Sequence, residues 1–143
     1  MITRRAKYAL KALLYLAQQP EGQTVLIRDL AKAERIPKKF LEQILLDLNR
    51  KGILQSRKGK GGGYLLGRSP AKIMMGEVIR LTDGPLAPVP CVSKTAYHRC
   101  EECVDEKTCR IRRVMKDVRD AIAGVMDKTS LADMLGKKGM KGA

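Results

Sequence analysis

Apolar residues recur every three or four positions in three stretches of the first half of the chain, covering about residues 3–19, 26–34 and 37–51. That spacing places the apolar side chains on one face of an α-helix. The second and third stretches are joined only by a tight turn at Arg35 and Ile36. Two short helices joined in this way predict a helix-turn-helix, in which the second helix enters the major groove of DNA.

The third helix has a defined start and end. Pro37 suits the first turn because the amide it lacks would be unpaired there, and Gly52 suits the left-handed position just past the last turn. The predicted apolar face consists of Leu41, Ile44, Leu45 and Leu48. The polar residues that face elsewhere are Lys38, Lys39, Glu42, Gln43 and Asn49. The helix therefore presents a second face that can read a partner.

A basic hairpin is predicted directly after this helix. Two short runs, 53–56 and 64–66, flank a segment that contains Arg57, Lys58, Lys60 and three consecutive glycines. Glycines accept the positive backbone angles of a tight tip. The hairpin adds a wing, so the first part of the chain is predicted to be a winged helix.

The second half predicts a helix over 75–83, a break rich in Pro and Gly, and a long helix over 109–127. Apolar residues of the long helix alternate in steps of four and three, which is typical of a helix that packs along another. They are Ile111, Met115, Val118, Ile122 and Val125, with Val114 and Ala121 beside them. A helix buried in a core would show the same pattern. We expect a dimer, because a symmetric dimer presents two reading helices about one DNA turn apart.

The predicted fold class is mainly α with a small β wing, a winged helix-turn-helix domain plus a long C-terminal dimerisation helix. Ser130 can cap a short final helix that ends near residue 135. The basic tail is expected to be mobile, with no role beyond phosphate contact. The predicted parts are a DNA-binding domain over 1–83, a cysteine-rich loop over 84–109, the dimerisation and terminal helices over 110–135, and the tail over 136–143.

Charge and composition narrow the classes of function. The 143 residues carry a formal charge of +14, and such an excess favours a polyanion because neutralised phosphates release counterions. A solvated basic surface is the plain alternative. The coincidence of the charge with a helix and hairpin of suitable shape favours nucleic acid. With no Trp and one Phe, stacking on single strands is not expected to be the main binding mode.

The sequence also predicts what the protein is not. No run of about 18 apolar residues exists, and Arg4, Arg5 and Lys7 lead into an amphipathic segment rather than a secretory signal. We therefore expect no membrane association and a cytoplasmic location, where thiols stay reduced unless a metal binds them. The lone His98 has no evident nucleophile partner. The glycines before Tyr64 are not followed by the start of a helix, as they would be in a phosphate-binding loop. We do not expect an enzyme.

Four cysteines lie within 19 residues in the pattern Cys91-x8-Cys100-x2-Cys103-x5-Cys109. Soft thiolates suit an iron-sulfur cluster or zinc. A structural zinc site usually has two close cysteine pairs, and here only Cys100 and Cys103 are close, so zinc is the less favoured metal. A disulfide or an unliganded set of cysteines is weaker still in a reducing compartment. His98 is either a further ligand or a solvated side chain.

Several motifs give the chain a clear resemblance to the bacterial IscR/NsrR/CymR family of winged-helix transcription regulators, over nearly its whole length. The motifs are Lys7-Tyr8-Ala9-Leu10, Ile36-Pro37, Leu41-Glu42-Gln43-Ile44-Leu45, Gly61-Gly62-Gly63-Tyr64-Leu65-Leu66, Gly76-Glu77-Val78-Ile79 and Thr129-Ser130-Leu131. The resemblance implies a homodimer in which the long helix crosses its partner. It also implies, for members with three loop cysteines, a 2Fe-2S or 4Fe-4S cluster that senses cluster supply, nitric oxide or redox state.

The resemblance places the three family ligands at Cys91, Cys103 and Cys109. Where the iron-sulfur regulator has a ligand histidine this chain has Arg112, and where the nitric oxide sensor uses an acidic ligand it has Lys7 and Tyr8. Neither family version of the fourth ligand is present. We hypothesise that Cys100 replaces it and gives an all-cysteine site.

The resemblance also implies which residues contact DNA. On the reading helix they are Lys39, Glu42 and Gln43, beside Lys38, and in the wing they are Arg57 and Lys58, beside Lys60. The predicted function is a homodimeric regulator, expected to be a repressor, that binds a palindromic operator in double-stranded DNA with an affinity set by the cluster. Two alternatives stay open: a cluster-free or zinc-binding regulator that senses thiol state, and a small iron-sulfur electron carrier.

Overall fold

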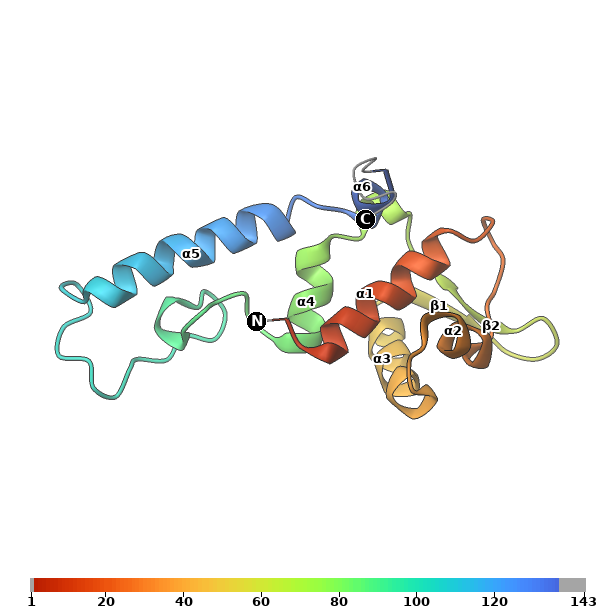
Figure 1. Ribbon diagram of the computed structural model, residues 1–143, viewed down its shortest axis with the longest axis horizontal. Helices are drawn as coiled ribbons and strands as arrows, with labels where there is room; N and C mark the ends of the chain where they lie inside the picture. The colour runs from red at the N-terminus through yellow and green to blue at the C-terminus, as the bar shows by residue number, and fades with distance from the viewer. Residues whose placement is uncertain (1, 137–143) are drawn as a thin grey trace.

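The computed structural model describes residues 2–136, so the predicted tail beyond Gly136 lies outside the described residues. The helices are α1 (Arg4–Ala17), α2 (Ile27–Glu34), α3 (Lys38–Arg50), α4 (Met75–Asp83), α5 (Arg110–Met126) and α6 (Leu131–Gly136). The strands are β1 (Leu54–Arg57) and β2 (Gly63–Leu66), and two short 3₁₀ turns are η1 (Pro70–Lys72) and η2 (Pro90–Val92). Figure 1 shows α5 and the cysteine loop at the opposite end of the molecule from the hairpin.

Helix α1 lies at the centre of the winged helix and contacts α2, α3, α4, α6 and β2. Its Ala6, Ala9 and Ala12 are completely buried, and such small side chains let neighbouring helices approach closely. Leu13 is also completely buried. The buried side chains of the core around α1 are all aliphatic, as expected for a chain with one Phe and no Trp. The mainly helical fold with a small two-stranded wing is confirmed.

The helix-turn-helix forms at the predicted turn. Arg35 takes a left-handed conformation (φ 54°), and the N–H of Ile36 donates to the carbonyl of Ala31 at 2.9 Å. Pro37 stands one residue before α3 instead of in its first turn, where its missing N–H costs nothing either. Gly52 has φ 74°, which is the predicted left-handed exit.

The wing is a two-stranded antiparallel sheet in which Leu54 pairs with Leu66 and Arg57 pairs with Gly63. Arg57 therefore lies at the end of β1, not in the tip where it was predicted. A bridge that the sequence did not predict ties β2 to the chain before α2, because Val25 and Tyr64 exchange two backbone hydrogen bonds of 2.8 Å. The wing is thus anchored twice, by its direct connection to α3 and by this bridge to the segment before α2.

After α5 the chain returns to the winged helix. The N–H of Met75 donates to the carbonyl of Thr129 at 2.8 Å, and the N–H of Leu131 donates to the carbonyl of Ile73 at 3.0 Å. Ser130 caps α6 as predicted, since its hydroxyl accepts from the N–H of Asp133 at 3.0 Å while the Asp133 carboxylate accepts from the N–H of Ser130 at 2.9 Å. Helix α6 packs against α1 and η1, and Leu131 is completely buried.

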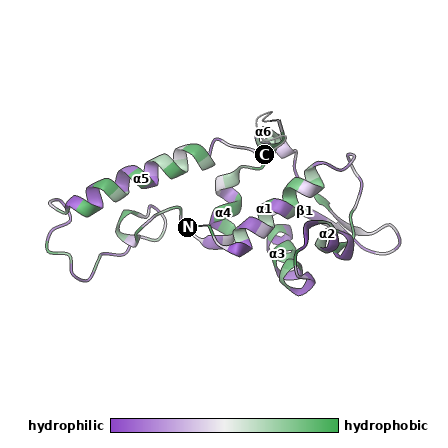
Figure 2. Cartoon of the chain, in the orientation of Figure 1, coloured by the Kyte–Doolittle hydropathy of each residue, from purple (hydrophilic) through white to green (hydrophobic). Residues whose placement is uncertain are grey.

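Helix α5 differs from every other long helix because it has no buried residue. Within the predicted seam, Met115 and Ile122 are half-buried, whereas Ile111, Val118 and Val125 are exposed. Hydrophobic and hydrophilic positions alternate along it in Figure 2. Among residues 2–136, no helix is long and apolar enough to cross a membrane.

Replacing Leu131 with Ala tests whether the C-terminal helix belongs to the winged-helix core. We expect the free energy of unfolding to fall by about 2–5 kcal/mol, because the buried side chain leaves a cavity. Chemical denaturation followed by circular dichroism measures it. As a control, Val104→Ala, at a side chain that is 95% exposed, should change stability by less than about 0.5 kcal/mol. Equal stability of the two variants would show that α6 is dispensable for the fold.

Candidate nucleic-acid interface and cysteine loop

The outward face of α3 carries the predicted DNA-contacting residues, and all of them are exposed. They are Lys38, Lys39, Glu42 and Gln43. The opposite face is occupied by completely buried leucine and isoleucine side chains. A helix held by one face in a core leaves the other free to enter a groove.

Two contacts with α1 orient this reading face. The guanidinium of Arg5 pairs with the carboxylate of Asp47 on α3. The ring of Phe40 meets the ring of Tyr8 edge to face, with centroids 5.6 Å apart and an interplanar angle of 86°. The direction of the reading face is therefore determined by α1 and not by α3 alone.

The wing presents its cations beside the same helix-turn-helix. Arg57, Lys58 and Lys60 are exposed, and Arg57 donates to the carbonyl of Gly22 at 3.4 Å. The tip is held by the Thr24 hydroxyl, which donates to the carbonyl of Gly61 at 2.7 Å. Ammonium and guanidinium groups on an anchored hairpin suit phosphate contact or insertion into a minor groove.

Sequence reasoning missed two residues on the reading face. Leu46 and Arg50 lie seven and eleven positions after Lys39, which places them on the same side of the helix. Leu46 is 38% exposed, and the Arg50 side chain is 67% exposed. Their helical spacing from Lys39 was the available signal, but Leu46 and Arg50 belonged to neither the predicted apolar face nor the predicted polar face.

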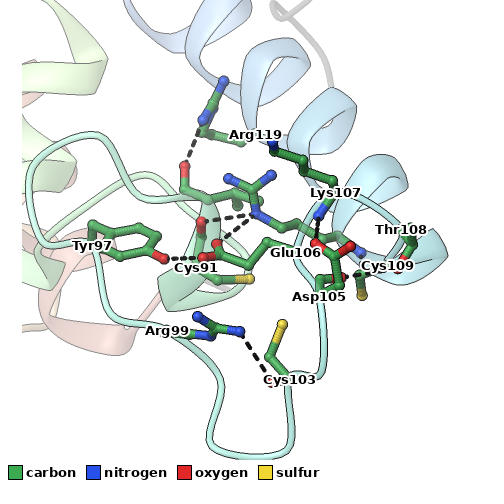
Figure 3. Close-up of polar contacts among 12 residues, drawn as sticks. Cys91, Tyr97, Arg99, Cys103, Asp105, Glu106, Lys107, Thr108, Cys109 and Arg119 are labelled. Atoms are coloured by element: carbon green, nitrogen blue, oxygen red, sulfur yellow. Dashed lines mark hydrogen bonds and ion pairs between the residues drawn. The ribbon is translucent and has the colours of Figure 1, made fainter.

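The four cysteines are free thiols, with Cys100 exposed and Cys91, Cys103 and Cys109 half-buried. Figure 3 shows the three half-buried residues in the loop and at the start of α5. Cys109 caps α5, since its sulfur accepts from the N–H of Arg112 at 3.4 Å.

Cys100 is in a different environment. Its thiol donates to the carboxylate of Glu102 at 3.1 Å, and this hydrogen bond raises the pKa of the thiol. A metal ligand must be a thiolate, so Cys100 has to break this contact before it can bind a metal. His98, the other candidate ligand, is exposed, and its backbone N–H donates to the carbonyl of Pro90 at 3.2 Å.

The thiols suit an iron-sulfur cluster in chemistry and number, but they are not gathered into a site. Within residues 2–136, no three or more His, Cys, Asp or Glu side chains are grouped to hold a metal. The loop is held mainly by polar contacts. Arg112 donates to the carbonyl of Cys91 at 3.4 Å and pairs with the carboxylate of Glu106 at 3.3 Å. Tyr97 donates to the same carboxylate at 2.5 Å, as Figure 3 shows. Between residues 84 and 109 only Val92 and Ser93 are buried. Gathering the thiols therefore requires movement of exposed chain and no disruption of the core.

The far end of α5 is joined to the winged helix by a bidentate ion pair. Arg80 of α4 donates to Asp127 at 2.6 and 2.8 Å, and this hydrogen bonding lowers the pKa of Asp127. The carboxylate occupies the space where a side chain at Gly76 would start. Since α4 packs against both α1 and α3, a continuous path of contacts leads from α5 to the reading helix.

Known proteins match this architecture along nearly the whole chain. The chain is 44% identical over 138 residues to a Rhodobacter capsulatus protein named as an rrf2-like HTH-type transcriptional regulator, covering 94% of this chain and 92% of that one. It is 34% identical over 134 residues to the HTH-type transcriptional regulator NsrR of Geobacillus kaustophilus, covering 94% and 88%. These relatives are named as transcriptional regulators, which are not enzymes.

A solved structure agrees with the fold. The structure of CymR, the global cysteine regulator of B. subtilis, matches with a TM-score of 0.77 and 28% identity, covering 94% of this chain and 95% of that one. The family model Rrf2, described as an iron-dependent transcriptional regulator, matches residues 2–137. The chain belongs to the Rrf2 family of transcriptional regulators.

Proposed function

We propose that this protein is a homodimeric repressor that binds a palindromic operator with an affinity set by an iron-sulfur cluster in the cysteine loop. The observation that carries the proposal is the exposed polar face of α3, oriented by α1 and flanked by a basic wing. Family membership supports DNA as the partner. The electron-carrier alternative has no support here, because an electron carrier needs neither an exposed polar face on α3 nor a basic wing.

Sequence recognition is assigned to the side chains of the reading face. Gln43 can make paired hydrogen bonds to adenine, and Glu42 can accept from the amino group of cytosine. Lys39 and Lys38 add cationic contacts near the start of α3. Arg57, Lys58 and Lys60 of the wing supply affinity that depends on salt, because their charges replace condensed counterions.

The dimer is assigned to the exposed apolar stripe of α5. Its members Ile111, Val114, Val118 and Val125 are 71%, 55%, 36% and 66% exposed. A stripe of exposed apolar side chains on one helix marks an interaction surface. A second copy of the chain offers an identical stripe, and the two-fold symmetry of such a pair matches a palindromic site.

The cluster is assigned to Cys91, Cys103 and Cys109, with Cys100 as the fourth ligand. When bound, an iron-sulfur cluster supplies a centre that responds to iron supply, oxidants and nitric oxide. The chain contributes soft thiols in a loop that can rearrange, and Cys109 stands at the start of α5. Movement of the loop can reach the reading helix through α5, the Arg80–Asp127 pair and α4.

A second candidate is a regulator of the same fold that senses thiol state, or holds zinc, without an iron-sulfur cluster. Within residues 2–136 the four free thiols are not grouped to hold a metal, and this favours the metal-free, thiol-sensing form of this candidate. It shares the DNA interface and the dimer with the first candidate and differs only in the loop.

Replacing Gln43 with Ala should weaken binding to the operator by about 1–3 kcal/mol and relax the preference at one base pair. Replacing Lys58 with Ala should weaken binding to all duplexes alike and lower the slope of log affinity against log salt by about one. Fluorescence anisotropy on operator and scrambled duplexes at several salt concentrations separates the two effects. Equal loss on both duplexes for Gln43→Ala would remove Gln43 from base recognition.

Replacing Val118 with Glu places a charge in the proposed dimer interface. We expect the dimerisation constant to fall by about 100-fold or more, because burying an uncompensated charge costs about 3 kcal/mol or more. Arg113→Glu puts the same side chain on the opposite face of α5 and should leave the dimer intact. Sedimentation equilibrium measures both variants. A dimeric Val118→Glu protein would place the interface elsewhere.

Anaerobic purification followed by a visible spectrum and iron and sulfide assays tests the cluster. We expect coloured protein with similar amounts of iron and acid-labile sulfide, loss of both in Cys103→Ser, and reduced amounts in Cys100→Ala. Lys107→Ala, an exposed position in the same loop, is the control. Unchanged iron in Cys100→Ala would exclude Cys100 as a ligand, and colourless wild-type protein after reconstitution would favour the thiol-sensing candidate.

A further inference from the structure

Leu46 lies at the centre of the reading face of α3. The completely buried residues of this helix are Leu41, Ile44, Leu45 and Leu48, and they define its inner side. Leu46 is 38% exposed and follows Lys39, Glu42 and Gln43 by seven, four and three residues. Those intervals put all four side chains on one face.

Nothing among the described residues explains an apolar side chain at this place. Leu46 is neither a member of the hydrophobic core nor one of the partly buried residues packed against it. The other exposed apolar residue of α3, Phe40, has a structural partner in the Tyr8 ring. Leu46 is surrounded along the helix by polar and charged side chains, including Arg50 at the next turn.

We propose that Leu46 reads thymine by contact with its C5-methyl group, so that each half-site of the operator requires an A·T pair at one position. This inference rests on the proposed DNA-binding function and extends it to a further specificity residue. A helix in the major groove reads bases with side chains at i, i+3, i+4 and i+7, as in the homeodomain. The residues Lys39, Glu42, Gln43 and Leu46 have this spacing.

The chemistry of the groove supports an apolar reader at this position. The thymine methyl is the only apolar group that a base pair presents in the major groove, and aliphatic side chains recognise it by contact. Polar neighbours can satisfy the hydrogen-bonding groups of adjacent bases, whereas a leucine over a cytosine amino group would leave that group unpaired. The cations Lys39 and Arg50 on either side draw the duplex onto this face.

Methyl deletion in the DNA tests the contact directly. Wild-type full-length protein, purified anaerobically, selects an operator from random duplexes, and each thymine of one half-site is then replaced by deoxyuridine. We expect one replacement to weaken binding by about fourfold, which corresponds to one buried methyl group. Binding by Leu46→Ala should be weaker on the thymine operator and unaffected by that replacement, and Leu46→Met should keep the response.

Leu26→Ala is the matched control, because Leu26 is a similarly exposed leucine (42%) that lies outside α3. It should keep the wild-type response to the missing methyl group. Two results would overturn the inference and leave the proposed function standing. One is wild-type binding that does not depend on any thymine methyl group of the operator. The other is a response to the missing methyl group that persists in Leu46→Ala. Failure of the wild-type protein to select any sequence would overturn the proposed function itself.

Discussion

Aliphatic packing around α1 positions every part of the winged helix. The completely buried alanines of this helix allow α3 and α4 to approach closely, and α2, α6 and the second wing strand contact it as well. The same helix supplies Arg5 and Tyr8, whose contacts with Asp47 and Phe40 orient α3. A change in the packing of α1 would thus alter the reading face without touching any residue on it.

The arm formed by the cysteine loop and α5 is built on the opposite principle. It contributes almost nothing to the core, and polar contacts of Arg112 and Arg119 hold its loop against the helix. Few buried apolar contacts mean a low free energy of local opening. The proposed sensing role requires this property, because ligand thiols would have to come together and separate while the winged helix stays folded.

Two connections tie this loose arm to the rigid unit. The first is the Arg80–Asp127 ion pair, which lies beside Gly76, and the second is the backbone bridge between Met74 and Ser130. Both involve α4 or the residue before it, and α4 packs on α1 and α3. A displacement of α5, caused by a partner or by the loop, would therefore be transmitted to the winged helix through α4.

Local sequence signals were enough to predict the helices, the strands and most residues of the reading face. The turn at Arg35, the exit at Gly52 and the cap at Ser130 depend on neighbouring residues, and they appear where predicted. Long-range contacts decided the rest. The Val25–Tyr64 bridge, the burial of Leu131 and the exposure of Leu46 depend on which segments meet in space. The pattern in α5 could not separate half-buried Met115 from exposed Val118. The cysteine spacing likewise identified four thiols without showing that, in the part of the chain that the structure describes, no three of them are grouped to hold a metal, since spacing along the chain does not record how a loop folds.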